Sequence, residues 1–288
     1  MNPVRIVTDS TGDVPAELAK ALEIEIVPCL VHVGETVYRD GVDLTPWAFY
    51  RLLMDRPGRL RTSQPTVVDF IHTYQRLLNG DPGASILSIH VASGFSGTIN
   101  AAWTAAQEMP DPSRVEVLDS GSISMGMGWT VIQAARLAQA GASREEIGSA
   151  IQGFKARRRT AAMVDRLDNL VQGGRLHSIV GALGTALRIK PLISLDDGEA
   201  RIWGRVRTRS RALEKLVAQV RAWGPLAELA LLYAGDEEMI HNLARELGDR
   251  VAADRLVIAP AGSALVAHLG LGALGACAVI ADGQTEQP

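Results

Sequence analysis

"SIHVASGFSGTINAAW", residues 88–103, lies where an apolar, strand-like run gives way to an alanine-rich, helix-like run. Three hydroxyl side chains and two glycines stand between the runs, namely Ser93, Ser96, Thr98, Gly94 and Gly97. A helix N-terminus presents unpaired N–H groups and partial positive charge, and glycine allows a ligand to approach the backbone closely. The stretch therefore predicts a binding site for a polar or anionic ligand. Helix capping is the alternative, but it needs only one hydroxyl.

The elements around this stretch alternate between strand and helix. Residues 4–8, 85–91 and 114–118 are predicted strands, and helix-start signals stand between or after them. Pro15 suits a first helical turn, Thr66 suits an N-cap, and Ser143 with Glu146 forms a capping-box pattern. This alternation predicts a parallel sheet that is covered by helices on both faces.

The second half of the chain is less regular. "PLISL" and "EARIW" flank Asp196-Asp197-Gly198, which is typical of a hairpin, and apolar residues recur at helical spacing after Thr208. "ELALLYA" and "RLVIA" are further predicted strands. We therefore expect an α/β fold of two domains. The first is a parallel-sheet domain over residues 1–160, the second is a mixed-sheet α/β domain over 161–282, and a ligand would lie between them.

Polar clusters follow several of the predicted strands. They are "TDSTGD" (8–13), "RTSQPT" (61–66) and "DSGSISMG" (119–126), in addition to the opening stretch. Ligands of open α/β sheets bind at the carboxyl ends of strands, so the clusters predict one polar crevice, with Ser10 and Ser120 among its residues. Asp9 and Asp119 could suggest metal or phosphoryl chemistry. The preferred interpretation is that they orient nearby hydroxyls and backbone amides.

Composition and charge exclude several classes of function. The net charge is −3, the cysteines are Cys29 and Cys277, and the six histidines show no short metal-binding spacing. We expect a cytoplasmic protein with reduced thiols, no metal and no cofactor. Aromatic residues make up only 5% and no nucleic-acid motif is present, so a nucleic-acid partner is not expected. Residues 261–281 carry no Lys, Arg, Asp or Glu, but glycines interrupt them. They predict a helix and a buried strand rather than a membrane span.

Positive charge is concentrated in one part of the chain. Residues 155–211 contain 13 Lys or Arg and only 5 Asp or Glu. The run "RVRTRSR" places Arg205, Arg207, Arg209 and Arg211 at alternating positions, which would face one side in an extended chain. An anionic partner and a solvated basic face both remain open.

Two further residues allow opposed interpretations. His268 lies in an apolar, glycine-rich stretch, where it could be a buried histidine bonded to a carbonyl or a donor to a bound anion. Gly94 and Ser96 match part of the hydrolase motif Gly-x-Ser-x-Gly, but Thr98 replaces its last glycine. Ser96 as a nucleophile is therefore a minor alternative.

Taken together, these motifs resemble the DegV family over residues 3–282. The resemblance rests on their order: "TDSTGDVP", "RTSQPT", "SGFSGT", "DSGSISMG", "GGRL" (173–176), "IKPLISLDDG" and "RVRTR". It implies a two-domain fatty acid-binding protein, similar to the lipid-carrying subunit of fatty acid kinase. It also implies that Thr62, Ser93 and His268 hold the carboxylate. Ala92, Ala267 and Leu271 depart from the family pattern around this site.

The resemblance implies a carrier rather than a complete enzyme. Such a protein binds one long-chain fatty acid and presents its carboxylate to a separate ATP-binding kinase subunit, which forms the acyl phosphate. The chain has no Gly-x-x-x-x-Gly-Lys-Ser/Thr phosphate loop of its own. Arg205, Arg207 and Arg209 are the candidates for contact with that subunit. The alternatives are a hydrolase or acyltransferase that uses Ser93 or Ser96, and a binder of another small anion.

Overall fold

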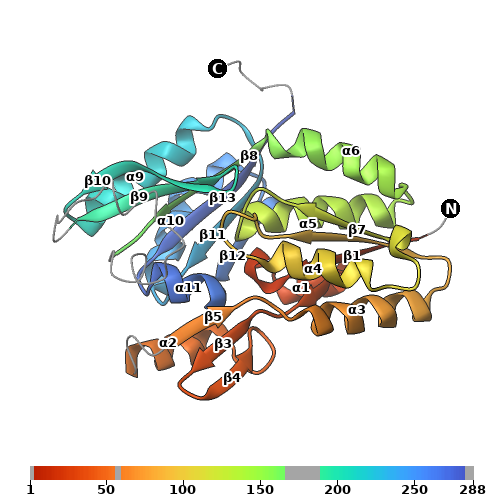
Figure 1. The fold of residues 1–288 in the computed structure, drawn as a ribbon. Helices are drawn as coiled ribbons and strands as arrows, with labels where there is room; N and C mark the ends of the chain where they lie inside the picture. The colour runs from red at the N-terminus through yellow and green to blue at the C-terminus, as the bar shows by residue number, and fades with distance from the viewer. Residues whose placement is uncertain (1–2, 56–59, 166–188, 283–288) are drawn as a thin grey trace.

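The computed structural model describes residues 3–55, 60–165 and 189–282 (Figure 1). Its strands are β1 (Val4–Asp9), β2 (Glu25–Val27), β3 (Leu30–Val33), β4 (Thr36–Arg39), β5 (Leu60–Ser63), β6 (Ser85–His90), β7 (Val115–Asp119), β8 (Arg158–Met163), β9 (Lys190–Asp196), β10 (Glu199–Val206), β11 (Leu226–Tyr233), β12 (Leu256–Pro260) and β13 (Leu274–Ile280). Its helices are α1 (Ala16–Ala21), α2 (Pro46–Asp55), α3 (Val67–Gly80), α4 (Thr98–Gln107), α5 (Met125–Gln139), α6 (Arg144–Lys155), α9 (Arg209–Ala222), α10 (Glu237–Leu247) and α11 (Ser263–Leu269).

The first half of the chain builds a parallel sheet in the order β2-β1-β6-β7. Its strands are buried on both faces, and successive side chains point to opposite faces. Val7 and Ile86 pack against α3 and α4, whereas Ile6 and Leu87 pack on the side of α5 and α6. The prediction of a parallel sheet covered on both faces is confirmed.

The second half builds a mixed six-stranded sheet in the order β10-β9-β8-β13-β11-β12. Only β11 and β12 pair in parallel; the other neighbours are antiparallel. One face is covered by α9 and α10, and the other faces α5 and α11. The predicted mixed sheet is confirmed, and the hairpin at Asp196–Gly198 is the turn between β9 and β10.

Helix α5 lies between the two sheets (Figure 1). Its first eleven residues are almost all buried, because small and apolar residues surround the helix on every side. The Trp129 indole N–H donates to the Cys277 carbonyl of β13 at 2.9 Å. The two halves therefore share one hydrophobic core. Strand β8 crosses the boundary predicted between residues 160 and 161, and the division into two domains stays a prediction.

A third, antiparallel sheet of order β4-β3-β5 lies beside α2 and α11. Gly34 and Glu35 form the turn that joins β3 and β4, and Gly34 adopts a φ of 63° in this turn. In Figure 1 this sheet and α2 form the lower edge of the molecule, next to α11. The sheet thus brings β5, with Thr62 and Ser63, close to the C-terminal helix.

Several local predictions are confirmed. Capping boxes begin α3 at Thr66 and α6 at Ser143, and Thr208 caps α9. Residues 261–281 contain α11 and the buried strand β13, as expected. Across the part of the chain that the structure describes, no helix is long and apolar enough to span a membrane. The "GGRL" stretch at 173–176 lies outside the described residues.

The expectation of an extended basic run is wrong in its second half. Arg205 lies in β10, but Arg209 and Arg211 lie in the first turn of α9. Thr208 caps this helix by accepting from the Arg211 N–H, so the chain changes from strand to helix within the run. The four arginines therefore cannot share one face through strand alternation.

Candidate functional site

The carboxyl ends of three parallel strands meet at one edge of the first sheet. Strands β1, β6 and β7 end at Asp9, His90 and Asp119, and the register pairs Thr8 with Ile89 and His90 with Asp119. The predicted gathering of polar strand ends is confirmed. Both carboxylates accept from backbone amides, Asp9 from Val91 at 3.1 Å and Asp119 from Ser93 at 3.1 Å. Their expected role in orienting the loops is confirmed.

A pocket of about 680 Å³, measured to its open mouth, lies against this edge. Its polar lining is Thr11, Thr62, Ser63, Gln64, Ser96 and His268. Its apolar lining includes Val91, Phe95, Ile123, Leu195, Leu265 and Leu269. These residues come from the first sheet, the small sheet, β9 and α11, so distant parts of the chain build the pocket together.

Thr62 and His268 form the polar centre of the pocket. Strand β5 presents Thr62, the last turn of α11 presents His268, and Thr62 Oγ1 lies 2.9 Å from His268 Nε2. An anion that reached this pair would meet a hydroxyl and an imidazole side by side. The structure brings Thr62 and His268 together, and their role in holding a carboxylate stays a prediction.

A second, apolar cavity adjoins the pocket. Leu195, Leu265 and Leu269 line both spaces. The second cavity extends over the mixed sheet, where its lining includes Ala162, Leu232, Ala273, Gly275 and Cys277. Small side chains on the strands leave this room between the sheet and α11. The two spaces together form a compartment with a polar end and an apolar end.

Ser93 and Gly94 do not line the pocket. The Ser93 side chain is exposed, and a Cβ at Gly94 would lie 2.3 Å from the Gly198 carbonyl. Gly94 is thus required by the close approach of the β9–β10 turn, whose Gly198 N–H also donates to the Gly121 carbonyl at 2.9 Å. Buried Ala92 lies next to Gly198 of this turn.

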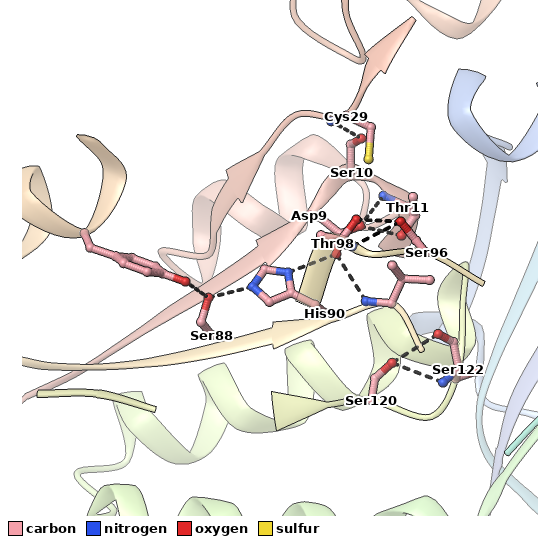
Figure 2. A network of polar contacts seen from close by, with 12 residues as sticks. Asp9, Ser10, Thr11, Cys29, Ser88, His90, Ser96, Thr98, Ser120 and Ser122 are labelled. Atoms are coloured by element: carbon pink, nitrogen blue, oxygen red, sulfur yellow. Dashed lines mark hydrogen bonds and ion pairs between the residues drawn. The ribbon is translucent and has the colours of Figure 1, made fainter. Parts of the chain in front are cut away.

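Ser10 and Ser120 hold the loops rather than line the pocket. Ser10 Oγ donates to Asp40 at 2.9 Å and accepts from the Cys29 N–H at 3.0 Å. Ser120 Oγ donates to the Ser122 carbonyl and accepts from its N–H, both at 3.1 Å. Figure 2 shows the contacts of Ser10 with Cys29 and of Ser120 with Ser122. The hydroxyls of Ser10 and Ser120 are therefore already engaged in hydrogen bonds that hold these loops.

Ser96 lines the pocket, but its contacts are those of a helix start. Its Oγ lies 2.8 Å from Thr98 Oγ1 and accepts from the Thr98 N–H at 3.2 Å. Within the described ranges, no histidine or carboxylate hydrogen bonds to Ser96 or to the Ser93 hydroxyl. The arrangement needed to activate a serine nucleophile is therefore not formed at either residue in those ranges.

Sequence reasoning missed a buried polar network behind the pocket (Figure 2). Tyr74 OH donates to Ser88 Oγ at 2.8 Å, Ser88 Oγ lies 2.7 Å from His90 Nε2, and His90 Nδ1 lies 2.9 Å from Asp9 Oδ2. The order Ser-His-Asp resembles a hydrolase triad, but Ser88 and His90 are fully buried. No substrate can reach Ser88. The sequence carried a signal for this network in "SIH", residues 88–90, because Ser88 and His90 are two polar residues on one face of a buried strand.

Asp9 connects this network to the pocket lining. Burial alone would raise the pKa of Asp9. The hydrogen bond and the charge of His90, together with hydrogen bonds from Thr11 and Val91, outweigh burial and hold this pKa below its usual value. Thr11 and Val91 both line the pocket. The ionised carboxylate therefore fixes part of the pocket floor through its hydrogen bonds.

Three other pocket features were not predicted. Cys29 lines the pocket as a buried thiol, and burial raises its pKa well above the usual value, so it acts as a small apolar wall. Gln64 and Phe95 also line the pocket. Among the residues that the structure describes, no group of three or more His, Cys, Asp or Glu could hold a metal ion.

The three candidate partner-binding arginines differ in their surroundings. Arg209 is bound by two carboxylates, Asp165 at 2.7 Å and Asp236 at 3.1 Å, and its side chain is 23% exposed. Arg205 and Arg207 are exposed. Arg209 therefore joins β8, α9 and α10 locally, and a partner would meet Arg205 and Arg207 first.

The chain matches one family model over almost its whole length. That model, described as "Uncharacterised protein, DegV family", covers residues 3–281. A DegV domain-containing protein of Caldanaerobacter subterraneus subsp. tengcongensis is 33% identical, over 96% of this chain and 98% of the relative. One from Streptococcus pyogenes serotype M3 is 35% identical, with 95% and 97% covered.

Solved structures show the same fold. A DegV family protein from Thermus thermophilus, described by its fatty acid binding, is 31% identical with a TM-score of 0.88, covering 97% of this chain and all of its own. DegV from Bacillus subtilis, described as a fatty acid binding protein, is 28% identical with a TM-score of 0.87, covering 98% and 100%. Family match, curated relatives and fold agree, and the chain belongs to the DegV family.

Proposed function

We propose that this protein binds one long-chain fatty acid, with the carboxylate at Thr62 and His268 and the acyl chain in the apolar cavity. The observation that carries the proposal is the 2.9 Å contact between these residues in a pocket that shares three leucines of its lining with an adjoining apolar cavity. The fatty acid binding described for the relatives from Thermus thermophilus and Bacillus subtilis supports it.

A carboxylate needs several donors in fixed positions, because charged hydrogen bonds depend on geometry. The Thr62 hydroxyl can donate to the carboxylate while it accepts from His268 Nε2–H, and the Ser96 hydroxyl and Gln64 amide line the same pocket. Ser93, predicted from the family resemblance, lies on the exposed loop beside the pocket. We assign it to the rim of the site, together with Gly94.

The acyl chain supplies most of the binding free energy. Each buried CH₂ contributes about 0.8 kcal/mol, so a long chain in a dry cavity gains far more than its carboxylate. The cavity offers Leu232, Leu265 and Leu269 as walls and small residues of β8 and β13 as floor. A short or strongly polar anion would leave these walls without contact, which favours a fatty acid over a small phosphate ester.

We further propose that this cytoplasmic carrier presents its ligand to a separate ATP-binding kinase subunit for acyl phosphate formation. Exposed Arg205 and Arg207 on and beside β10 supply positive charge that can steer a partner and its nucleotide. The protein itself then acts as a binding subunit and not as a complete enzyme. The domain 1–160 would supply Thr62 to the carboxylate site, and the domain 161–282 would supply His268 and most of the wall of the acyl cavity.

The proposal is tested by ligand capture and by direct titration. Native mass spectrometry of the purified protein should show an added mass that matches a fatty acid. Titration of delipidated protein with oleate should give saturable binding of one molecule per chain, while octyl phosphate should bind far more weakly. Equal binding of octyl phosphate, or no saturable binding of oleate, would contradict the proposal.

A further inference from the structure

The amino end of α11 is held by two carboxylates from the first half of the chain, the half-buried Asp13 and the buried Asp40. Asp13 Oδ1 accepts from the Gly262 N–H at 2.9 Å, and Asp40 Oδ1 accepts from the Ser263 N–H at 3.3 Å. The first N–H groups of a helix have no partner inside the helix, so side chains that accept from them fix where it begins.

The Asp13 carboxylate packs closely against the Cα position of Gly262. A Cβ at Gly262 would lie 2.7 Å from Asp13 Oδ1, so any larger residue there would force the carboxylate to move. Tyr50 OH donates to the neighbouring Ala261 carbonyl at 2.6 Å. The chain just before α11 is therefore clamped from two sides, by a carboxylate and by a phenol.

Asp13 is itself held in a demanding conformation. It adopts a φ of 49°, and its Oδ2 accepts at 2.6 Å from Ser124 Oγ, whose residue has a φ of 56°. Non-glycine residues keep such angles only where the surroundings impose them, and such sites cluster where function depends on position. Asp13 and Ser124 are two such residues, and they are hydrogen bonded to each other beside the pocket.

The charge on Asp13 also opposes folding. Burial, with smaller effects from Asp40 and Asp9, raises the pKa of Asp13 to about 7. An asparagine would be better suited to this burial, since it carries no charge.

The other end of α11 carries the polar centre of the pocket. His268 lies in the last turn of this seven-residue helix, and Ala264, Leu265 and Leu269 line the same pocket. A helix this short moves as one piece. A shift at Gly262 therefore changes the position of His268 relative to Thr62.

We propose that Asp13 is a positioning residue for the fatty acid carboxylate: through Gly262 it fixes the start of α11 and thereby holds His268 against Thr62. This inference rests on the proposed function for its ligand but not for its geometry. Asp13 does not touch the carboxylate; it acts through the helix.

Two variants test the contact from its two sides. Asp13→Gly removes the carboxylate and suits a φ of 49°, whereas Gly262→Ala keeps the carboxylate and pushes it away. Each should lower oleate affinity by about tenfold, the effect of weakening one hydrogen bond to a charged group. The affinity for oleyl alcohol, which has the same chain and no charge, should change little. The double variant should bind oleate no worse than either single variant.

A conservative variant and a spectroscopic readout complete the test. Asp13→Asn keeps an acceptor for Gly262 and tolerates the left-handed region, so it should stay within about threefold of wild type. Asp43→Ala, an exposed carboxylate on the loop after β4, is the control. The His268 imidazole NMR signal of ligand-free protein should move in Asp13→Gly and Gly262→Ala but not in Asp43→Ala.

An equal loss of oleate and oleyl alcohol, additive losses in the double variant, or an unmoved His268 signal would each overturn the proposal. The NMR readout needs no ligand. Failure of wild-type protein to bind oleate would therefore reject the proposed function, while a displaced His268 would still support the positioning role of Asp13.

Discussion

Thr62 and His268 lie 206 positions apart in the chain, and their Oγ1 and Nε2 atoms lie 2.9 Å apart. The contact joins the small sheet to the C-terminal helix across the mouth of an apolar compartment. Each residue alone is ordinary, one a strand threonine and one a histidine in an apolar stretch. Their meeting gives the pocket its polar end, and the first prediction follows from it.

Thr62→Val should lower the affinity for a long-chain fatty acid by about tenfold to a hundredfold. The change keeps the shape of the side chain and removes one hydroxyl, and a hydrogen bond to a charged group contributes roughly 1.5–3 kcal/mol. Isothermal titration of delipidated protein with oleate measures the effect. Thr36→Val, at an exposed position of β4 in the same sheet, is the matched control. Equal affinities for both variants and the wild type would place the carboxylate elsewhere.

Ala162→Val should shift the preference toward shorter fatty acids. Ala162 lines the inner cavity over the mixed sheet, so two added methyl groups remove room at the apolar end. Affinities for acids of 12 to 18 carbons, measured by competition, should fall most for the longest, at about 0.8 kcal/mol per CH₂ that no longer fits. Ala278→Val, buried on the α9 and α10 side of β13, is the control for overpacking. A uniform loss across chain lengths would contradict this position for the acyl chain.

Asp13→Asn should stabilise the protein at pH 8 and change little near pH 4. Burial raises the pKa of Asp13 from 3.8 to about 7. The folded state therefore keeps a proton that the unfolded chain loses between these values, and folding stability falls as the pH rises through that window. At about 1.4 kcal/mol per pKa unit the effect reaches a few kcal/mol above pH 7.

Thermal unfolding of wild type and variant between pH 4 and pH 8 measures this difference. The gap in melting temperature should open as the pH rises and level off above pH 7. Asp43→Asn, whose exposed carboxyl has a pKa lowered to about 2 by Arg39, is the opposite case and should not become more stable at pH 8. A constant gap for Asp13→Asn across the range would mean that this carboxyl does not titrate there.

Arg207→Glu should leave fatty acid binding nearly intact and weaken acyl phosphate formation when a kinase subunit is added. The residue is exposed and does not line the pocket, so its charge acts on an approaching partner. The loss should be largest at low ionic strength, where steering by charge is strongest. Arg221→Glu, at a half-exposed position on α9, is the control. Loss of lipid binding without loss of phosphorylation would place Arg207 in the pocket instead.

Arg209 shows why one basic run does not act as a unit. The sequence shows four arginines at alternating positions, but Thr208 begins a helix and turns Arg209 toward Asp165 and Asp236. Alternation predicts a shared face only while the backbone stays extended. The cap was visible in the sequence, whereas the two carboxylates that receive Arg209 come from other elements.

The sequence by itself determined the local structure and the family. Apolar runs that end in hydroxyls and glycines define β1, β6 and β7 and their polar ends, and capping signals at Thr66 and Ser143 define helix starts. These features depend on neighbours a few residues away, so the sequence carries them in full. The order of the motifs identified the family for the same reason.

Only the tertiary structure decided which polar residues share a site. It joined Thr62 to His268, placed Ser93 outside the pocket, used Ser10 and Ser120 to hold loops, and set Asp13 against Gly262. A hydroxyl can cap a helix, hold a loop or bind a ligand, and which of these it does depends on the partner within about 3 Å. Those partners lie on elements far along the chain, so their positions follow from the packing of the sheets and α11, which no local pattern encodes.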